Sequence, residues 1–400
     1  MTEPAELLVD RRELPLAGRR IALGVTGSIA AFKAADLASK LRQAGATVEV
    51  IMTRAATQFI TPLTFQSLTG LPVIVDMFTA AEPEAHVEVA RRADALVIAP
   101  ATADCIANLA HGQTPDMVTL TALAITAPVL VAPAMDSQMW EHAATQSNVE
   151  TLRSRGVTFI GPASGRLASG RTGAGRLAEP QQVLGALRAL LGQQSGDLVG
   201  RHIVVSAGPT QEPIDPVRYI GNRSTGKMGF AIAEAARDRG ARVTLVSGPV
   251  ALETPFGVDR LDVRTVAEML AALQVATAHS DAIIMAAAPA DFRPANPAGH
   301  KLKKSDGADL MTIELTKTSD IIATLPGGGV RVGFAAETRN LAEYARAKLP
   351  AKRLHFIVAN DVSATGSGFG TETNEVTFFH DDGRHEELPL LSKYAVAHAI

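Results

Sequence analysis

Short apolar runs alternate with helical segments along almost the whole chain. In the first half these runs lie at residues 19–25, 47–52, 93–100 and 127–133, and amphipathic or alanine-rich stretches separate several of them. Near-continuous apolar strands between helices are typical of a parallel sheet that helices cover on both faces. The pattern therefore predicts an α/β fold with a doubly wound parallel sheet.

The same alternation begins again after residue 200, where strands are expected near 201–207, 241–248, 281–288, 330–337 and 355–361. The stretch at 191–200, LGQQSGDLVG, is polar and contains three glycines, which favours a linker. We expect two α/β domains, residues 1–190 and 201–400, joined by this linker. Near the C-terminus, NEVTFFHDDGRHEEL predicts a hairpin that turns at Asp382 and Gly383.

Charge and cysteine content exclude several classes of protein. The 400 residues carry a formal charge of −3, so no overall basic surface indicates a nucleic acid or membrane partner. Cys105 is the only cysteine, which excludes an internal disulfide framework and a cysteine-rich zinc site. Neither a signal peptide nor an apolar stretch of about 20 residues is evident. We expect a cytoplasmic protein without a transmembrane helix.

Three turns in the first half indicate a ligand site. GVTGSIAA, at residues 24–31, joins the first strand to a helix, where backbone N–H groups can bind a phosphate. Its G-x-x-G-S spacing differs from the dinucleotide fingerprint, so a mononucleotide fits better, although a plain helix cap explains the motif equally well. PATAD at 100–104 and APAMDSQMW at 132–140 also follow strands, whose carboxyl ends line the ligand crevice of such sheets.

These turns, with His86 before a short amphipathic helix, resemble the flavin-containing cysteine decarboxylases over residues 18–190. Within that family the likeness is greatest to phosphopantothenoylcysteine decarboxylases. The resemblance implies a flavodoxin-like domain that binds FMN noncovalently and in which His86 is catalytic. In this family the flavin oxidises the cysteine thiol, carbon dioxide leaves, and the hydride returns. The implied flavin contacts are Gly27, Ser28, Thr53, Pro100, Ala101, Thr102 and Ala103.

Three positions depart from the family pattern in ways that matter. Asp104 replaces the asparagine of the family's PATAN motif. Asp136 stands where the family has an asparagine that holds the substrate carboxylate. Ser169, in the glycine-rich segment 161–180, stands where the family has a cysteine that donates a proton. A hydroxyl is a much weaker acid than a thiol. Either Ser169, another acid or water donates the proton, or the first half has lost its activity.

The second half contains the long motif SAGPTQEPIDPVRYIGNRSTGKMG at residues 206–229. GNRSTGK matches the spacing of a P-loop, but Met228 replaces the Ser or Thr that binds Mg²⁺, and no strand directly precedes the match. We therefore expect a loop that enters a helix near Gly226. With ADFRP at 290–294, KLKK at 301–304, KTSDI at 317–321 and VGFAAET at 332–338, the segment resembles phosphopantothenate–cysteine ligases over nearly all of residues 200–390.

The ligase resemblance implies a Rossmann-like domain and a reaction in two steps. Phosphopantothenate reacts with CTP and Mg²⁺ to form an acyl cytidylate, and L-cysteine then displaces CMP. Asn222 is implied to face the acyl carbonyl and Lys301 to bind the phosphates; the Mg²⁺ ligands stay unassigned. Further implied substrate contacts are Asp136 in the first half and Asp291, Ser319, Asp320, Ile321, Ile322, Phe334, Lys348 and Lys352 in the second.

Many bacteria carry both activities in one chain in this order, so the resemblance implies two consecutive steps. The ligase product, phosphopantothenoylcysteine, would be decarboxylated to 4′-phosphopantetheine by the first half. The implied assembly is a homo-oligomer with trimeric flavin domains and dimeric ligase domains, for which a dodecamer is one arrangement, with flavin sites at subunit contacts. The alternative is an active ligase joined to an impaired flavin domain. His380 and His385, on the predicted hairpin, are interpreted as solvated residues.

Overall fold

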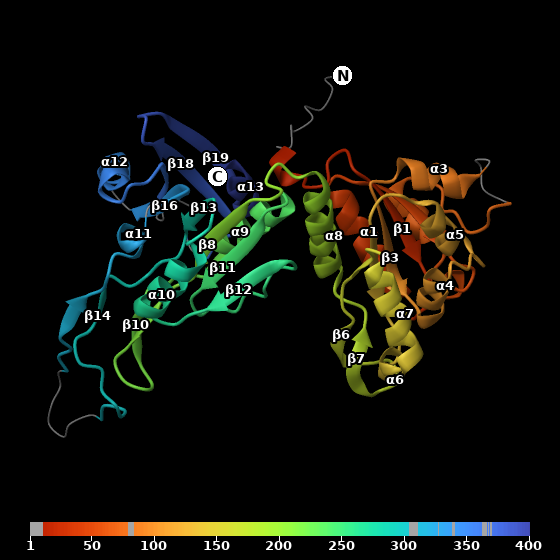
Figure 1. Cartoon of the computed structure of the whole chain (residues 1–400), viewed down its shortest axis with the longest axis horizontal. Coiled ribbons are helices and arrows are strands. Elements are labelled where there is room, and N and C mark those ends of the chain that lie inside the picture. Colours follow the sequence, from red (N-terminus) through yellow and green to blue (C-terminus); the bar gives the residue numbers. More distant parts are fainter. Residues whose placement is uncertain are drawn as a thin grey trace, which may run out of the picture. The chain divides into compact units, whose positions relative to one another are not determined.

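A computed structural model describes residues 11–78, 84–303, 311–326, 328–337, 341–361, 366, 368 and 370–400. The chain divides into two compact units, Met1–Gln194 and Ser195–Ile400 (Figure 1). Helix α8 (Pro180–Ser195) includes residues 191–195, so half of the segment predicted as a linker is helical. None of the helices in the described ranges is long and apolar enough to cross a membrane.

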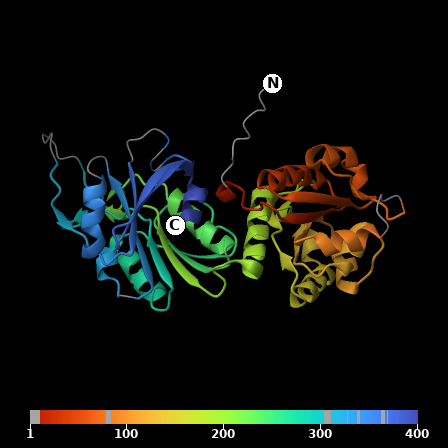
Figure 2. The ribbon, with the colours of Figure 1, turned by 90° about the horizontal axis from the view of Figure 1, so that it is seen from above.

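The described part of the first unit contains a five-stranded parallel sheet with the order β2-β1-β3-β4-β5. This is the flavodoxin-like order, as predicted, and it reverses between β1 and β3, where such folds bind their ligands. Helices cover both faces of the sheet (Figure 2). The strands are β1 (Arg20–Val25), β2 (Thr47–Met52), β3 (Ala95–Ala101), β4 (Val129–Pro133) and β5 (Thr158–Phe159).

Between these strands run helices that mostly match the predicted segments. One boundary differs, because His86 is the second residue of α3 and does not precede the helix. The elements are η1 (Arg11–Glu13), α1 (Ala31–Gln43), η2 (Ala56–Gln58), α2 (Pro62–Thr69), α3 (Ala85–Arg92), α4 (Ala103–His111), α5 (Met117–Ala124), α6 (Ser137–Glu141) and α7 (Ala143–Ser154).

The glycine-rich segment 161–180 has no apolar periodicity that would predict a strand, yet it contains two short strands. Residues Ala163–Arg166 (β6) and Thr172–Arg176 (β7) pair as an antiparallel hairpin, which we call the flap. Gly175 lets the flap approach the loop after β4, because a Cβ there would lie 2.3 Å from the carbonyl oxygen of Met135. The Met135 amide donates to the carbonyl of Gly175 at 2.9 Å. Close backbone contact therefore orders a segment that has no apolar periodicity.

The second unit contains a sheet with the order β12-β11-β8-β13-β16-β17-β18-β19 in its described part. The strands from β12 to β17 are parallel, and their order is that of a Rossmann fold, as predicted. The strands are β8 (His202–Ala207), β11 (Arg242–Ser247), β12 (Val258–Asp262), β13 (Ala282–Met285), β16 (Val330–Glu337), β17 (Phe356–Asp361), β18 (Thr373–His380) and β19 (His385–Ser392).

Two of the predicted turns are confirmed in this unit. The β18–β19 hairpin turns at the predicted place, and Gly383 there has φ +88°. Helix α9 (Lys227–Asp238) begins directly after Gly226, so residues 222–226 form a loop that enters a helix, as predicted. Although β8 ends at Ala207, a short strand, β10 (Tyr219–Gly221), ends at Gly221, so the expectation that no strand directly precedes the GNRSTGK motif is wrong. The other helices are α10 (Val266–Ala276), α11 (Ile321–Thr324), α12 (Leu341–Ala351) and α13 (Lys393–Ala399).

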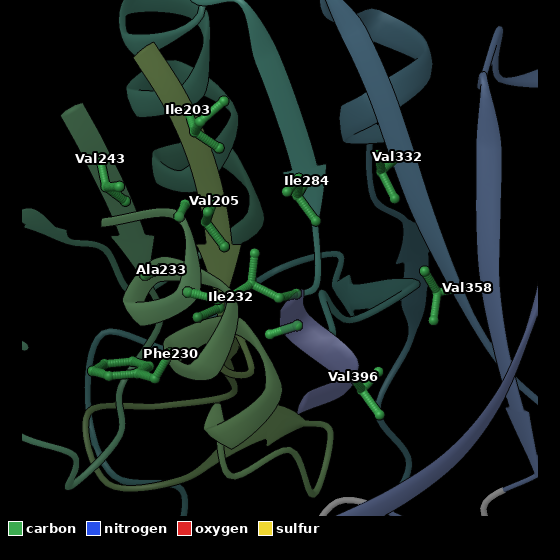
Figure 3. Close-up of a cluster of buried hydrophobic side chains, with 14 of the residues drawn as sticks. Ile203, Val205, Phe230, Ile232, Ala233, Val243, Ile284, Val332, Val358 and Val396 are labelled. Atoms are coloured by element: carbon green, nitrogen blue, oxygen red, sulfur yellow. The ribbon is translucent and has the colours of Figure 1, made fainter. Parts of the chain in front are cut away.

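Apolar side chains from successive residues of β8 enter different cores. Val205 packs with α9 and α13 residues, including Ile232 and Val396 (Figure 3). Val204 packs on the other face with α10 and α11 residues such as Met269. Because strand side chains alternate between faces, a doubly covered strand must be apolar at every position. Short hairpins β9 (Gln211–Pro213) with β10 (Tyr219–Gly221) and β14 (Phe292–Pro294) with β15 (Leu315–Lys317) extend from the loops after β8 and β13.

Candidate active sites

A cavity of about 900 Å³ opens at the carboxyl ends of β1, β2 and β3 in the first unit. Of the predicted cofactor contacts, Gly27, Thr53, Thr102 and Ala103 line it. Ser28 lines a neighbouring cavity instead, and the side chain of Ala101 is buried in the core. The cavity lies where the strand order reverses, and its volume suits a nucleotide-sized cofactor.

Thr26, which the sequence analysis did not single out, joins the two strands at this point. Its hydroxyl donates to the carbonyl of Pro100 at 2.7 Å and accepts from the amide of Thr102 at 3.1 Å. The side chain is buried, so both bonds are shielded from water. Thr102 in turn caps helix α4 through the amide of Cys105. Thr26 thus sets the distance between the turn after β1 and the turn after β3.

Cys105 also lines the 900 Å³ cavity but cannot replace the missing flap cysteine. Burial raises the pKa of the Cys105 thiol far above its ordinary value, and the nearby Asp116 and Asp104 raise it further. A thiol in such surroundings stays protonated and unreactive at neutral pH. Asp116 is engaged as the cap of helix α5, where it accepts from the amides of Val118 and Thr119.

A second cavity of about 500 Å³ lies between the β1–α1 turn and the flap. Its lining includes Asp136, Ser169 and the cationic side chains of Arg166 and Arg176. Four residues line both cavities, which therefore adjoin: Gly27, Thr102, Ala103 and Met139. A substrate in the smaller cavity would lie beside a cofactor in the larger one.

Ser169 and Asp136, two of the three departures from the family pattern, are in direct contact. The Ser169 hydroxyl donates to Oδ2 of Asp136 at 2.7 Å, while Oδ1 accepts from the amide of Gln138 at 3.1 Å. The bond from Ser169, and then that from Gln138, hold the pKa of Asp136 below its ordinary value. Asp136 is therefore ionised at neutral pH, and the hydroxyl proton of Ser169 lies against a carboxylate.

The base of the flap is tied to helix α1 by charged groups. Glu179 accepts from Lys33 at 2.8 Å and from Arg176 at 2.9 Å. The Lys33 bond is the main reason that the pKa of Glu179 is lowered. His86 lies elsewhere: among the described residues that line either cavity it does not occur, and its buried Nδ1 has no hydrogen-bond partner. One chain does not bring His86 to the Ser169–Asp136 pair.

In the second unit, the loops after β8 and β13 meet where the strand order reverses. The amide nitrogen of Asn222 donates to the carbonyls of Ala288 at 3.2 Å and Pro289 at 2.9 Å. The amide of Ala290 donates to the hydroxyl of Thr210 at 2.9 Å. Asn222 therefore links the GNRSTGK loop to the ADFRP loop, which the sequence analysis assigned to the same site.

Part of the predicted nucleotide site also assembles after β13. The amide of Thr318 donates to the carbonyl of Asp291, which places the KTSDI segment beside it. Asp320 caps helix α11 and pairs with Lys352 at 3.0 Å. Lys301 lies exposed in the preceding loop, and Ser319 is also exposed.

Other predicted contacts differ in what they can offer a ligand. Ile321 and Ile322 are buried in the core, so only their backbone can face a nucleotide. Phe334 packs against the core on the opposite face of the sheet, and Lys348 is half-buried on α12. Within the ranges that the structure describes, no group of three or more His, Cys, Asp or Glu side chains could hold a metal ion.

Comparisons with known proteins show which family the chain belongs to. Residues 10–192 match the family model of flavoproteins, and residues 198–400 match that of the DNA/pantothenate metabolism flavoprotein C-terminal domain. The chain is 48% identical over 392 residues to the coenzyme A biosynthesis bifunctional protein CoaBC of Bacillus subtilis (strain 168), covering 96% of each. It is 47% identical over 387 residues to that of Escherichia coli (strain K12), covering 95% of each.

A solved C-terminal domain of a CoaBC protein is 42% identical, covers 51% of this chain and 94% of that one, and has a TM-score of 0.44. The two matched models make the chain a two-domain flavoprotein of the pantothenate-metabolism type. At 44–48% identity over nearly its whole length, it belongs to the family of bifunctional coenzyme A biosynthesis proteins, CoaBC.

Proposed function

We propose that this chain catalyses two consecutive steps of coenzyme A biosynthesis. The unit Ser195–Ile400 joins L-cysteine to 4′-phosphopantothenate with CTP, and the unit Met1–Gln194 decarboxylates the product to 4′-phosphopantetheine. One observation carries the proposal: in each unit the candidate active site lies where the order of parallel strands reverses. That is the ligand-binding edge of doubly wound folds.

FMN fits the larger cavity of the first unit. Backbone amides of the turn around Gly27 can bind its phosphate, and Val75, Leu120 and Met139 offer apolar surface to its ring. The hydroxyls of Thr26 and Thr53 fix the walls, since both are bonded within the protein. When bound, FMN would supply the oxidation that makes the carboxylate labile and the hydride that restores the carbon.

The chain's own residues would manage charge and protons beside the cofactor. Arg166 and Arg176 can attract the carboxylate or phosphate of the substrate. An ionised Asp136 would repel that carboxylate, so it serves instead as the acceptor of the thiol proton: the S–H bond breaks and an O–H bond forms. Ser169, hydrogen-bonded to Asp136, returns a proton to the carbon that has lost carbon dioxide.

In the second unit, the phosphopantothenate carboxylate would attack the α-phosphate of CTP and release pyrophosphate. Lys301 opposes the charge that develops on the phosphates, and Mg²⁺ arrives bound to the nucleotide. The cysteine amine then attacks the acyl carbonyl, loses a proton and displaces CMP. Asn222 holds the GNRSTGK loop against Ala288 and Pro289, so that this loop faces the acyl group.

Self-association belongs to the same proposal, with trimeric flavin units, dimeric ligase units and flavin sites at subunit contacts. Phe78 is 86% exposed at the larger cavity, and Phe32 is 63% exposed at the smaller one. Aromatic side chains at the rim of a site are covered when a second copy packs there. The separation of His86 from Ser169 within one chain fits a site that a second copy completes.

The test follows both products in one reaction. Purified protein is given CTP, Mg²⁺, phosphopantothenate and L-cysteine, and pyrophosphate and carbon dioxide are measured together. We expect equal amounts of both, and without cysteine a single burst of pyrophosphate and no carbon dioxide. Pyrophosphate without carbon dioxide would contradict the decarboxylase assignment, and absence of both would contradict the whole proposal.

A further inference from the structure

A buried carboxylate in the loop after β8 accepts hydrogen bonds from three directions. The side chain of Asp215 has no exposed surface. Its Oδ1 accepts from the amides of Val217 and Arg218, both at 2.8 Å. Its Oδ2 accepts from the guanidinium of Arg218, at 3.0 Å from Nε and 2.6 Å from Nη2. Oδ1 therefore stabilises a local turn, while Oδ2 binds the side chain of Arg218.

Asp215 and Arg218 both bind the backbone of Leu302, which lies in the loop after β13. The amide of Leu302 donates to Oδ2 of Asp215 at 3.1 Å, and Nη2 of Arg218 donates to the carbonyl of Leu302 at 2.8 Å. Leu302 stands between Lys301 and Lys303, and both lysines are exposed. The segment that carries the two lysines is thus fixed to the other loop through its main chain.

Because the backbone between the two lysines is already fixed, little conformational entropy of this segment is lost when a ligand binds. Lysine is a compact charge on a flexible stem, so the position of its backbone decides where the charge can reach. The Arg218 bond, with backbone amides including that of Leu302, holds the pKa of Asp215 well below its usual range. The carboxylate stays ionised at neutral pH, and charge-assisted bonds to it are the stronger kind.

We propose that Asp215 is a positioning residue for the ligase reaction, which holds Leu302 so that Lys301 and Lys303 face the triphosphate of the nucleotide. Asp215 itself does not touch the nucleotide and acts through the two lysines. The inference rests on the proposed function, because only that function assigns Lys301 to the phosphates. The KLKK motif alone does not connect Asp215 to these lysines; the hydrogen bonds to Leu302 do.

The first test is Asp215→Asn, which separates the two carboxylate oxygens. An amide can keep one acceptor for the amides of Val217 and Arg218, so the local turn survives. Its NH₂ group then faces the amide of Leu302 and the Arg218 guanidinium, where an acceptor is needed. We expect the pyrophosphate burst from CTP and phosphopantothenate, without cysteine, to slow by roughly a hundredfold, as for other misplaced catalytic groups.

A second measurement distinguishes positioning from a general structural role. In a Lys301→Gln, Lys303→Gln background, Asp215→Asn should slow the burst by less than about threefold, because residues that act as one unit are not additive. Hydrogen exchange at Leu302 should quicken in Asp215→Asn, while protection of β8 and β13 stays unchanged. Hydrogen exchange can be measured without enzymatic activity, so it tests the inference even if the variant is poorly active.

Asp281→Asn is the matched control. Asp281 also accepts from a backbone amide, that of His202 at 2.8 Å, and from an arginine, Arg201 at 2.9 Å. It precedes β13, at the opposite end of the strand from the lysines. We expect its burst to match the wild type.

The outcomes distinguish failure of the positioning role of Asp215 from failure of the proposed function. An active wild type in which the losses from Asp215→Asn and the lysine changes multiply would overturn the positioning role alone. An unchanged burst in Asp215→Asn would do the same. A wild type that releases no pyrophosphate would overturn the proposed function and, with it, this inference.

Discussion

The hydroxyl of Ser169 donates to the carboxylate of Asp136, and 2.7 Å separate Oγ from Oδ2. The two residues are 33 positions apart, and each differs from the residue that the decarboxylase pattern has there. In the fold they form a hydrogen-bonded pair: Asp136 lies on the loop after β4, and Ser169 lies on the flap that packs against this loop. The effect of changing either residue should therefore depend on the other.

The first prediction concerns the flap. Ser169→Ala removes the bond to Asp136, so the pKa of Asp136 rises toward its ordinary value and the proton relay is lost. We expect formation of 4′-phosphopantetheine from phosphopantothenoylcysteine to slow by about a hundredfold, the usual scale for a lost general acid, because the proton is needed after carbon dioxide has left. Ser164→Ala, an exposed position on the same hairpin, is the control and should keep the wild-type rate. Equal rates in all three proteins would show that Ser169 is a bystander.

A second prediction addresses the flavin cavity. Thr26→Val keeps the shape of the side chain but removes the bonds to Pro100 and Thr102. We expect the stability of the first unit to fall by about 1–3 kcal/mol, because a buried amide loses its acceptor. Affinity for FMN should fall as well, measured by quenching of flavin fluorescence. In Thr121→Val a buried hydroxyl loses only its bond to Met117 within α5, so FMN affinity should not change.

The third prediction separates the two ligase half-reactions. Asn222→Asp places a carboxylate against the carbonyls of Ala288 and Pro289. In the proposed function this residue also lies near the oxyanion that forms when cysteine attacks, which the new charge would repel. We expect up to one pyrophosphate per site and then a stall, even with cysteine present. Lys301→Gln should instead lose the burst itself, by roughly a hundredfold. Pyrophosphate release with and without cysteine measures both effects.

Gln274→Ala, on the exposed face of α10, serves as the control for these ligase variants. Wild-type turnover in Asn222→Asp would mean that the GNRSTGK loop does not reach the carbonyl. A normal burst in Lys301→Gln would remove that lysine from the phosphates.

The fourth prediction is a dependence of stability on pH. The ammonium of Lys393 is buried and donates to the carbonyls of Gly368 at 2.8 Å and Thr371 at 2.5 Å. Burial, with a smaller contribution from Lys227, lowers the pKa of Lys393 from 10.5 to about 8. Between these pH values the unfolded chain binds more protons than the folded one, so this group makes stability rise with pH.

Lys393→Met should remove that rise, which amounts to at most about 3 kcal/mol. Urea unfolding followed by circular dichroism at several pH values between 8 and 10.5 measures it, with flavin fluorescence reporting the first unit separately. Lys317→Met, at an exposed position on β15, is the control. Parallel pH profiles for the wild type and Lys393→Met would contradict the prediction.

Periodicity alone predicted the two sheets, because a strand covered on both faces must be apolar at every position, as in the core residues Val204 and Val205. It could not predict the flap, whose strands are ordered by backbone contact at Gly175 and not by apolar burial. Strand β12 also carries too few apolar residues to stand out, since most of its side chains are not buried.

For the candidate sites, the sequence by itself determined which residue types are present and which motifs they belong to. Through the resemblance to the two families it marked Ser169 and Asp136 as departures and Lys301 and Asn222 as candidates, because the motifs that carry the resemblance are local. Only the tertiary structure decided that Ser169 meets Asp136, that Thr26 joins β1 to β3, and that Asp215 holds Leu302. Those contacts join residues 33 to 87 positions apart, and their partners are set by strand order and loop packing, which no local pattern encodes.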